Sequence, residues 1–191
     1  LRDSDWHVSV AVQDGVVTRV SDHSAPLLGL AVDLGTTKIA GYLVDLETGE
    51  TLASQGRMNP QIAYGEDVVA RISRVNQSPE EATRLRELVV DALNALTADL
   101  CDRTETSPDD VVEAVVVGNT AMHHLFLELP VRQLALAPYV PAVSRALDVR
   151  ARAVGLDIAP GGMVHLLPNV AGYVGADHVA MLLATGIANA D

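Results

Sequence analysis

The sequence is poor in cysteine, in aromatic residues and in positive charge. Of its 191 residues, 3% are aromatic and one is a cysteine, Cys101. One cysteine can form neither an internal disulfide nor a cysteine-based metal site, so we expect a reducing, cytoplasmic environment. Lysine and arginine number 13 against 25 acidic residues, which gives a formal net charge of −12. This balance argues against a protein that binds nucleic acid or an anionic membrane, because both partners attract basic patches.

Long apolar runs are also lacking, and none reaches the length of a membrane span. Hydrophobic residues nevertheless make up 49% of the chain, so alanine, valine and leucine must build the core. The length suffices for one sizeable domain and part of another. The chain begins with leucine and ends just after a helical pattern, and we interpret it as a fragment of a longer protein.

Residues 1–26 are predicted to be a separate unit. Alternating valines in "WHVSVAVQDGVVTRV" (6–20) flank Asp14-Gly15, a pattern typical of a hairpin with a two-residue turn. A lone hairpin is marginally stable in water. We therefore expect residues 1–26, which include the linker "SDHSAP" (21–26), to belong to a domain that lies mostly upstream.

Residues 27–191 predict an α/β fold with a mixed sheet and helices on both faces. Strands are expected at 28–34, 38–46, 51–58, 111–118 and 163–167, and helices within 64–75, 78–101, 119–129 and 176–187. Ser78, Pro79 and Glu81 are expected to start the longest helix with a capping box. The proline-rich stretch 130–160 does not indicate one conformation.

The corner "DLGTT" (33–37) joins two strongly apolar strands and carries more polar atoms than a hairpin needs. The Asp33 carboxylate suits a hydrated Mg²⁺, bound through water. Gly35 allows a phosphate to approach the backbone, and Thr36 and Thr37 offer hydroxyl and N–H donors. We favour phosphate binding over an ordinary glycine corner. Lys38 is either a further phosphate ligand or a solvated strand residue.

Other polar residues have simpler interpretations. Asn119 and Thr120 follow a strand and are expected to cap the next helix rather than to contact a ligand. His123 and His124 are adjacent, so they point about 100° apart on a helix and cannot chelate one metal together. We expect one of them in the core and the other on the surface.

Two more positions remain open in the stretch "NPQIAYGEDVV" (59–69). Asn59 and Gln61 are candidates to face a ligand cleft. Glu66 and Asp67 are expected only to favour the start of a helix.

The 33–37 corner resembles the first phosphate motif of the superfamily that contains actin, sugar kinases and heat-shock chaperone ATPases. The resemblance implies an actin-like (ribonuclease H-like) ATPase fold, with Mg²⁺ and ATP held in a cleft between two halves. No second Asp-x-Gly-Thr follows residue 37, so residues 27–191 would be the first half only. In related sugar kinases an acid at a position like that of Asp177 acts as the base; Asp177 would here orient a water or Mg²⁺ ligands, or would merely favour a helix N-terminus.

A narrower resemblance comes from residues 28–50, 59–72, 115–127 and 137–186. These stretches are similar to the reductive activators of corrinoid-dependent proteins. The resemblance implies an ATP-dependent reduction of corrinoid cobalt from Co(II) to Co(I), docking of the corrinoid protein and a possible homodimer. The parent would carry a ferredoxin domain with a two-iron two-sulfur cluster, which this chain cannot ligate with one cysteine. The resemblance also implies that residues 1–26 are the tail of the parent's small middle domain with its linker. This chain alone would be inactive.

Two other functions stay open. One is a small-molecule kinase of the same superfamily with Asp177 as the base. The other is a nucleotide-gated interaction domain, as in actin-like assembly proteins. A cluster motif upstream would favour the activator, a sugar-sized pocket the kinase, and nucleotide-dependent polymerisation the interaction domain.

Overall fold

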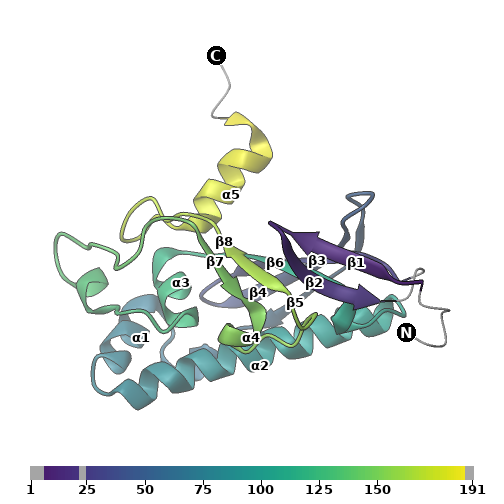
Figure 1. The fold of residues 1–191 in the computed structure, drawn as a ribbon. Coiled ribbons are helices and arrows are strands. Elements are labelled where there is room, and N and C mark those ends of the chain that lie inside the picture. Colours follow the sequence, from purple (N-terminus) through teal and green to yellow (C-terminus); the bar gives the residue numbers. More distant parts are fainter. Residues whose placement is uncertain (1–6, 22–24, 188–191) are drawn as a thin grey trace.

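The computed structural model describes residues 7–21 and 25–187, which form a two-stranded hairpin and a six-stranded sheet with helices (Figure 1). The hairpin consists of β1 (Ser9–Gln13) and β2 (Val16–Ser21). The sheet contains β3 (Leu28–Leu34), β4 (Lys38–Asp45), β5 (Thr51–Met58), β6 (Val111–Val117), β7 (Leu147–Arg150) and β8 (Met163–Leu166). The α-helices are α1 (Val68–Val75), α2 (Pro79–Arg103), α3 (Thr120–Phe126), α4 (Ala151–Val154) and α5 (Ala176–Thr185), and the 3-10 helices are η1 (Pro60–Tyr64), η2 (Pro108–Asp110) and η3 (Arg132–Ala135).

The predicted α/β class, the mixed sheet and the preceding hairpin are confirmed. In Figure 1 the long helix α2 runs below the sheet, and α5 rises from the opposite side. The predicted boundary between residues 26 and 27 stays a prediction, and residues 22–24 of the predicted linker lie outside the described residues.

The strand order β5-β4-β3-β6-β8-β7 places a change of direction at the centre of the sheet. On one side, β3 pairs antiparallel with β4, and on the other it pairs parallel with β6, which in turn pairs parallel with β8. The carboxyl ends of β3, β6 and β8 therefore meet at one edge. Ligands of open α/β sheets bind at such an edge, where the chain leaves neighbouring strands in opposite directions.

The core lies between one face of the sheet and α2. The helix face that contacts the sheet is fully buried at Leu85, Val89, Leu93, Leu96 and Leu100. A Cβ atom on Gly41 in β4 would lie 2.6 Å from Leu96 Cδ2, so this glycine lets the helix lie close to the sheet. Each such buried side chain contributes about 1.5–3 kcal/mol relative to an exposed one.

The start of α2 is only partly as predicted. Ser78 caps the helix by accepting a hydrogen bond from the Glu81 N–H, and Pro79 is its first residue. The second hydrogen bond of a capping box would run from the Ser78 N–H to the Glu81 side chain. This part of the prediction was wrong, because the Glu81 carboxylate pairs with Arg74 at the end of α1. A charged guanidinium is a stronger donor to this carboxylate than a neutral backbone N–H.

The stretch 130–160 holds two elements that the sequence did not indicate. Strand β7 pairs antiparallel with the edge of β8, and the single turn α4 follows it directly. Both are four residues long, which is too short for a hydrophobic period to be distinguished from a loop.

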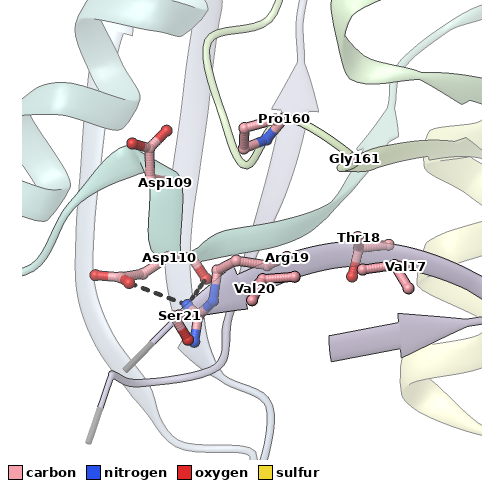
Figure 2. A pocket seen from close by; sticks show the side chains of 9 residues that line it. All are labelled: Val17, Thr18, Arg19, Val20, Ser21, Asp109, Asp110, Pro160 and Gly161. Carbon is pink, nitrogen blue, oxygen red and sulfur yellow. Dashed lines mark hydrogen bonds and ion pairs between the residues drawn. The ribbon is translucent and has the colours of Figure 1, made fainter. Parts of the chain in front are cut away.

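The hairpin is attached to the amino end of β6, far along this strand from its carboxyl end (Figure 2). Arg19 is 7% exposed, and its Nη1 atom lies 3.0 Å from Asp110 Oδ1 and 2.6 Å from the Pro26 carbonyl oxygen. The Gly161 N–H donates to the Thr18 carbonyl at 3.0 Å. A cavity of about 440 Å³ lies at this joint, away from the edge where β3, β6 and β8 end.

Candidate functional site at the carboxyl ends of the strands

Three segments that are far apart in the sequence meet at the carboxyl edge of the sheet. They are the loop 33–37 after β3, Gly118-Asn119 after β6, and Gly175-Ala176-Asp177 at the start of α5. Asn119 Nδ2 donates to Thr36 Oγ1 at 3.0 Å. The Asp177 N–H donates to the Gly118 carbonyl at 3.3 Å. The structure thus brings Asp177 to the loop that contains the other predicted ligand-binding residues.

Glycines make this close approach possible. A Cβ atom on Gly118 would lie 2.6 Å from the Leu34 carbonyl oxygen, and one on Gly175 would lie 2.4 Å from the Gly118 carbonyl oxygen. Both contacts involve backbone atoms, so no side-chain rotation could relieve them. The close packing at this edge therefore requires a residue without a side chain at Gly118 and at Gly175.

Substitution Gly175→Ala is expected to lower the free energy of unfolding by about 2 kcal/mol, because the new methyl group must displace the end of β6 or the start of α5. Equilibrium urea unfolding measures the effect. Gly56→Ala in β5 is the matched control, since its Cβ would meet no atom closer than Ile39 O at 3.8 Å. Equal unfolding free energies for the two variants would contradict the prediction.

The loop 33–37 is supported from inside the protein. Asn59 Nδ2 donates to the Gly35 carbonyl at 2.9 Å, and the Asn59 N–H donates to the Thr37 carbonyl at 2.9 Å. Arg71 Nη2 donates to the Thr36 carbonyl at 2.7 Å. These three carbonyl groups are thereby turned towards the protein interior.

The expectation that Asn59 and Gln61 face a ligand cleft was wrong. Both are buried, and Gln61 Nε2 donates to the Leu85 carbonyl at 2.9 Å. Asn59 is instead the N-cap of η1, and its Oδ1 atom accepts from the Gln61 N–H. Asp67 caps α1 through the Ala70 N–H at 2.7 Å, as its predicted structural role requires.

The outer side of the loop carries Asp33, Thr37 and Lys38, all of which are exposed, and the half-buried Thr36. Partial burial raises the pKa of the Asp33 carboxyl above its usual value, and the negative charge of Asp177 raises it further. Asp177 Oδ1 accepts hydrogen bonds from the His178 N–H at 2.9 Å and is 3.0 Å from His178 Nδ1. Two carboxylates that repel each other in this way would be stabilised by a shared cation.

The chemistry of this donor set fits Mg²⁺. Mg²⁺ keeps several waters and is usually bound by one or two carboxylates together with substrate phosphates. Asp33 offers an exposed carboxylate at the loop, and the charge of Asp177 acts on it. The described ranges 7–21 and 25–187 contain no group of three or more His, Cys, Asp or Glu residues that would form an all-protein metal cage.

Helix α3 begins as predicted, with Asn119 Oδ1 accepting from the Met122 N–H at 3.0 Å. Thr120 does not cap the helix, and its hydroxyl donates to the Ala171 carbonyl at 2.6 Å. Asn119 therefore both caps α3 and holds Thr36 of the loop.

The expectation that one of the two histidines is exposed was wrong. His123 is 3% exposed and His124 is fully buried. His124 Nδ1 donates to the Thr120 carbonyl at 2.8 Å, so His124 Nε2 is the acceptor for the N–H groups of Ala142 and Val143. Loop 138–146 covers a helix face that the sequence alone left open.

The fold and the site define a mixed α/β domain whose polar loop, carboxylates and helix start converge at the switch point of the sheet. The family model described as "RACo middle region" matches residues 28–190. The chain belongs to this family.

Two relatives agree with this assignment. A corrinoid activation enzyme, RamQ, from Eubacterium limosum is 35% identical over 163 residues, which cover 85% of this chain and 28% of that protein. A solved structure of a reductive activator for a corrinoid, iron-sulfur protein has a TM-score of 0.91 and 39% identity, and the match covers 100% of this chain and 31% of that chain. The chain thus spans about three tenths of the length of these relatives. None of its described helices is both long and apolar enough to cross a membrane.

Proposed function

We propose that residues 27–191 are the first half of an actin-like ATPase domain in a reductive activator of corrinoid proteins, and that residues 1–26 end an upstream domain. The observation that supports this proposal most is the meeting of Asp33, Thr36, Asn119 and Asp177 at the switch point, in a chain whose relatives are corrinoid activators. The other half of the nucleotide cleft would lie in a part of the protein outside this chain.

The residues of this edge have distinct roles in the proposal. Thr36 and Thr37 donate hydroxyl and backbone N–H groups to phosphate oxygens, and Gly35 leaves the backbone accessible. Lys38 adds a positive charge at the exposed side of the loop. Asp33 holds the waters of Mg²⁺, and Asp177 orients the water that attacks the terminal phosphate. Bound Mg²⁺ would supply neutralisation of the charge on the phosphates.

The proposed reaction couples two balanced steps. One electron converts Co(II) of the corrinoid protein to Co(I), and hydrolysis of ATP to ADP and phosphate supplies the free energy. The electron comes from a two-iron two-sulfur cluster elsewhere in the longer protein, because Cys101 is the only cysteine in this chain. The isolated chain would bind nucleotide weakly and transfer no electron. We further propose a cytoplasmic homodimer that docks a corrinoid protein as its partner. It would bind neither nucleic acid nor membrane.

The test uses a full-length protein that contains this chain. Its visible absorption is recorded before and after addition of dithionite, and then with a Co(II) corrinoid protein in the presence and absence of Mg·ATP. We expect absorption that dithionite bleaches, followed by formation of Co(I) only when ATP is present. An iron-free, colourless protein would overturn the proposal, and phosphoryl transfer to small alcohols and acids would then be tested with Asp33 and Asp177 as kinase residues.

A further inference from the structure

Arg71 is a fully buried arginine whose hydrogen-bond acceptors are all neutral. Its side chain is 0% exposed. Nε donates to the Gly65 carbonyl at 2.9 Å, Nη1 to Gln61 Oε1 at 3.1 Å, and Nη2 to the Thr36 carbonyl at 2.7 Å. Nη1 also contacts Met122 Sδ at 3.2 Å. The guanidinium is well hydrogen-bonded, but none of these partners carries a negative charge.

Two other arginines near the site are paired directly with carboxylates. Arg74, one turn further along α1, pairs with Glu81, and Arg57 pairs with Asp99 at 2.6 Å. Arg71 forms no ion pair among the described residues; the carboxylate that acts on it electrostatically is Asp67, which caps the same helix. Burial lowers the pKa of Arg71 below its usual value, in keeping with a charge that has lost its hydration. A buried charge without a counter-ion is costly and requires compensation.

The position of the guanidinium indicates where a negative charge that compensates it would bind. Nη2 donates to the inner side of the loop 33–37 at the Thr36 carbonyl. The outer side of the same loop presents Asp33, Thr37 and Lys38 to solvent. The buried cation is therefore in direct contact with the loop backbone. A bound polyanion there would face a positive charge that water cannot screen, unlike the charge of the exposed Lys38.

We infer that Arg71 is a positioning and specificity-determining residue, whose buried charge makes the loop prefer ligands with more phosphates. It acts through the Thr36 carbonyl and does not touch the ligand. The inference rests on the proposed function, and the chemical class that it identifies is the nucleoside polyphosphate, with affinity rising from nucleoside to diphosphate to triphosphate.

The test measures dissociation constants of adenosine, ADP and ATP by titration calorimetry in the presence of Mg²⁺, with a full-length protein that contains this chain. Arg71→Met and Arg71→Gln remove the charge, and Gln keeps donors for the Thr36 carbonyl. Arg71→Lys keeps the charge. Arg74→Met is the matched control, because it removes a neutralised arginine from the same helix. Circular dichroism checks that each variant is folded.

We expect the neutral variants to lose about tenfold or more of the preference for ATP over adenosine, with adenosine affinity unchanged. The Lys variant and Arg74→Met should keep the preference. Because the Arg71 charge is buried, the difference in ATP preference between wild type and Arg71→Met should persist at high salt. The corresponding difference for Lys38→Met should become smaller, because salt screens an exposed charge.

Three outcomes would overturn the inference. Equal losses for adenosine and ATP would assign Arg71 a purely structural role in holding the loop. An unchanged preference in a folded neutral variant would show that the charge has no effect on the ligand. Failure of both neutral variants to fold, with a folded Lys variant, would show that the fold itself needs the charge without any anion. Absence of ATP binding by the wild-type protein is a separate result, which would contradict the proposed function.

Discussion

Asp33→Asn is expected to reduce ATP-dependent activity of the full-length protein at least about 100-fold and, at the same time, to stabilise the nucleotide-free protein. Activity falls because an amide cannot replace a carboxylate as a partner of hydrated Mg²⁺. Stability rises because the substitution removes a carboxylate whose charge is disfavoured by partial burial and by Asp177. Asp33 is exposed and Asp177 is half-buried, so solvent screens much of the repulsion, and we expect a gain of about 0.2–1 kcal/mol.

The direction of the Asp33 pKa shift determines how the stability difference between wild type and Asp33→Asn depends on pH. The folded state raises the pKa of Asp33 above 3.8, so it binds protons more readily than the unfolded state does. The penalty is therefore absent at low pH and develops as the pH rises through that pKa. Thermal unfolding of wild type and Asp33→Asn should diverge towards neutral pH and converge in acid.

Asp45→Asn provides the opposite case. Hydrogen bonds from the N–H groups of Thr48 and Glu47 lower the pKa of the Asp45 carboxyl, so its replacement should destabilise the protein at neutral pH. If Asp33→Asn behaved like Asp45→Asn, the repulsion between Asp33 and Asp177 would be refuted.

Acidification from about pH 7 to pH 4 is expected to destabilise the protein through His123. Burial lowers the pKa of this histidine to about 4, and the neighbouring His124 contributes. In the unfolded state this histidine binds a proton near pH 6.5, whereas in the folded state it does so only near pH 4. Stability is therefore lost as the pH falls from 6.5 towards 4. The difference between 6.5 and about 4 corresponds to about 3 kcal/mol.

Urea unfolding at a series of pH values measures this loss. His123→Leu removes one of two buried histidines, so its free energy of unfolding should depend less on pH between 7 and 4 than that of the wild type. Burial also lowers the pKa of His124, so part of the slope should remain. His7→Gln replaces an exposed histidine and should leave the wild-type pH dependence intact. The same acid slope in His123→Leu and wild type would rule out His123 as the cause.

The strands of the sheet could be predicted from the sequence because their signals are local. Strand β3 begins and ends where its apolar run indicates, and the Asp33 corner follows at the expected strand end. The Ser78 and Asn119 caps were predictable for the same reason, since a cap needs only its own helix. Strand β7 was not, because four residues at a sheet edge depend on pairing with β8, which lies 13 or more residues further along the chain.

The inner half of the candidate site was not predictable for a related reason. Arg71 lies on a helix with charged neighbours, and its sequence context is that of an exposed residue, yet Thr36 and Gln61 surround it in space. The prediction that one of the two histidines is exposed was wrong for the same reason, because loop 138–146 covers His124. Whether a polar group is buried depends on which distant segments pack over it. The spacing of residues along a helix does not indicate those segments.

The Arg19–Asp110 pair has a mechanical consequence. It fastens the hairpin to the amino end of β6, and the carboxyl end of the same strand leads into Asn119, which holds Thr36. An extended strand of seven residues is about 20 Å long. The hairpin and the loop 33–37 are therefore attached to opposite ends of the same strand, so a shift of β6 along its axis would displace both attachment points.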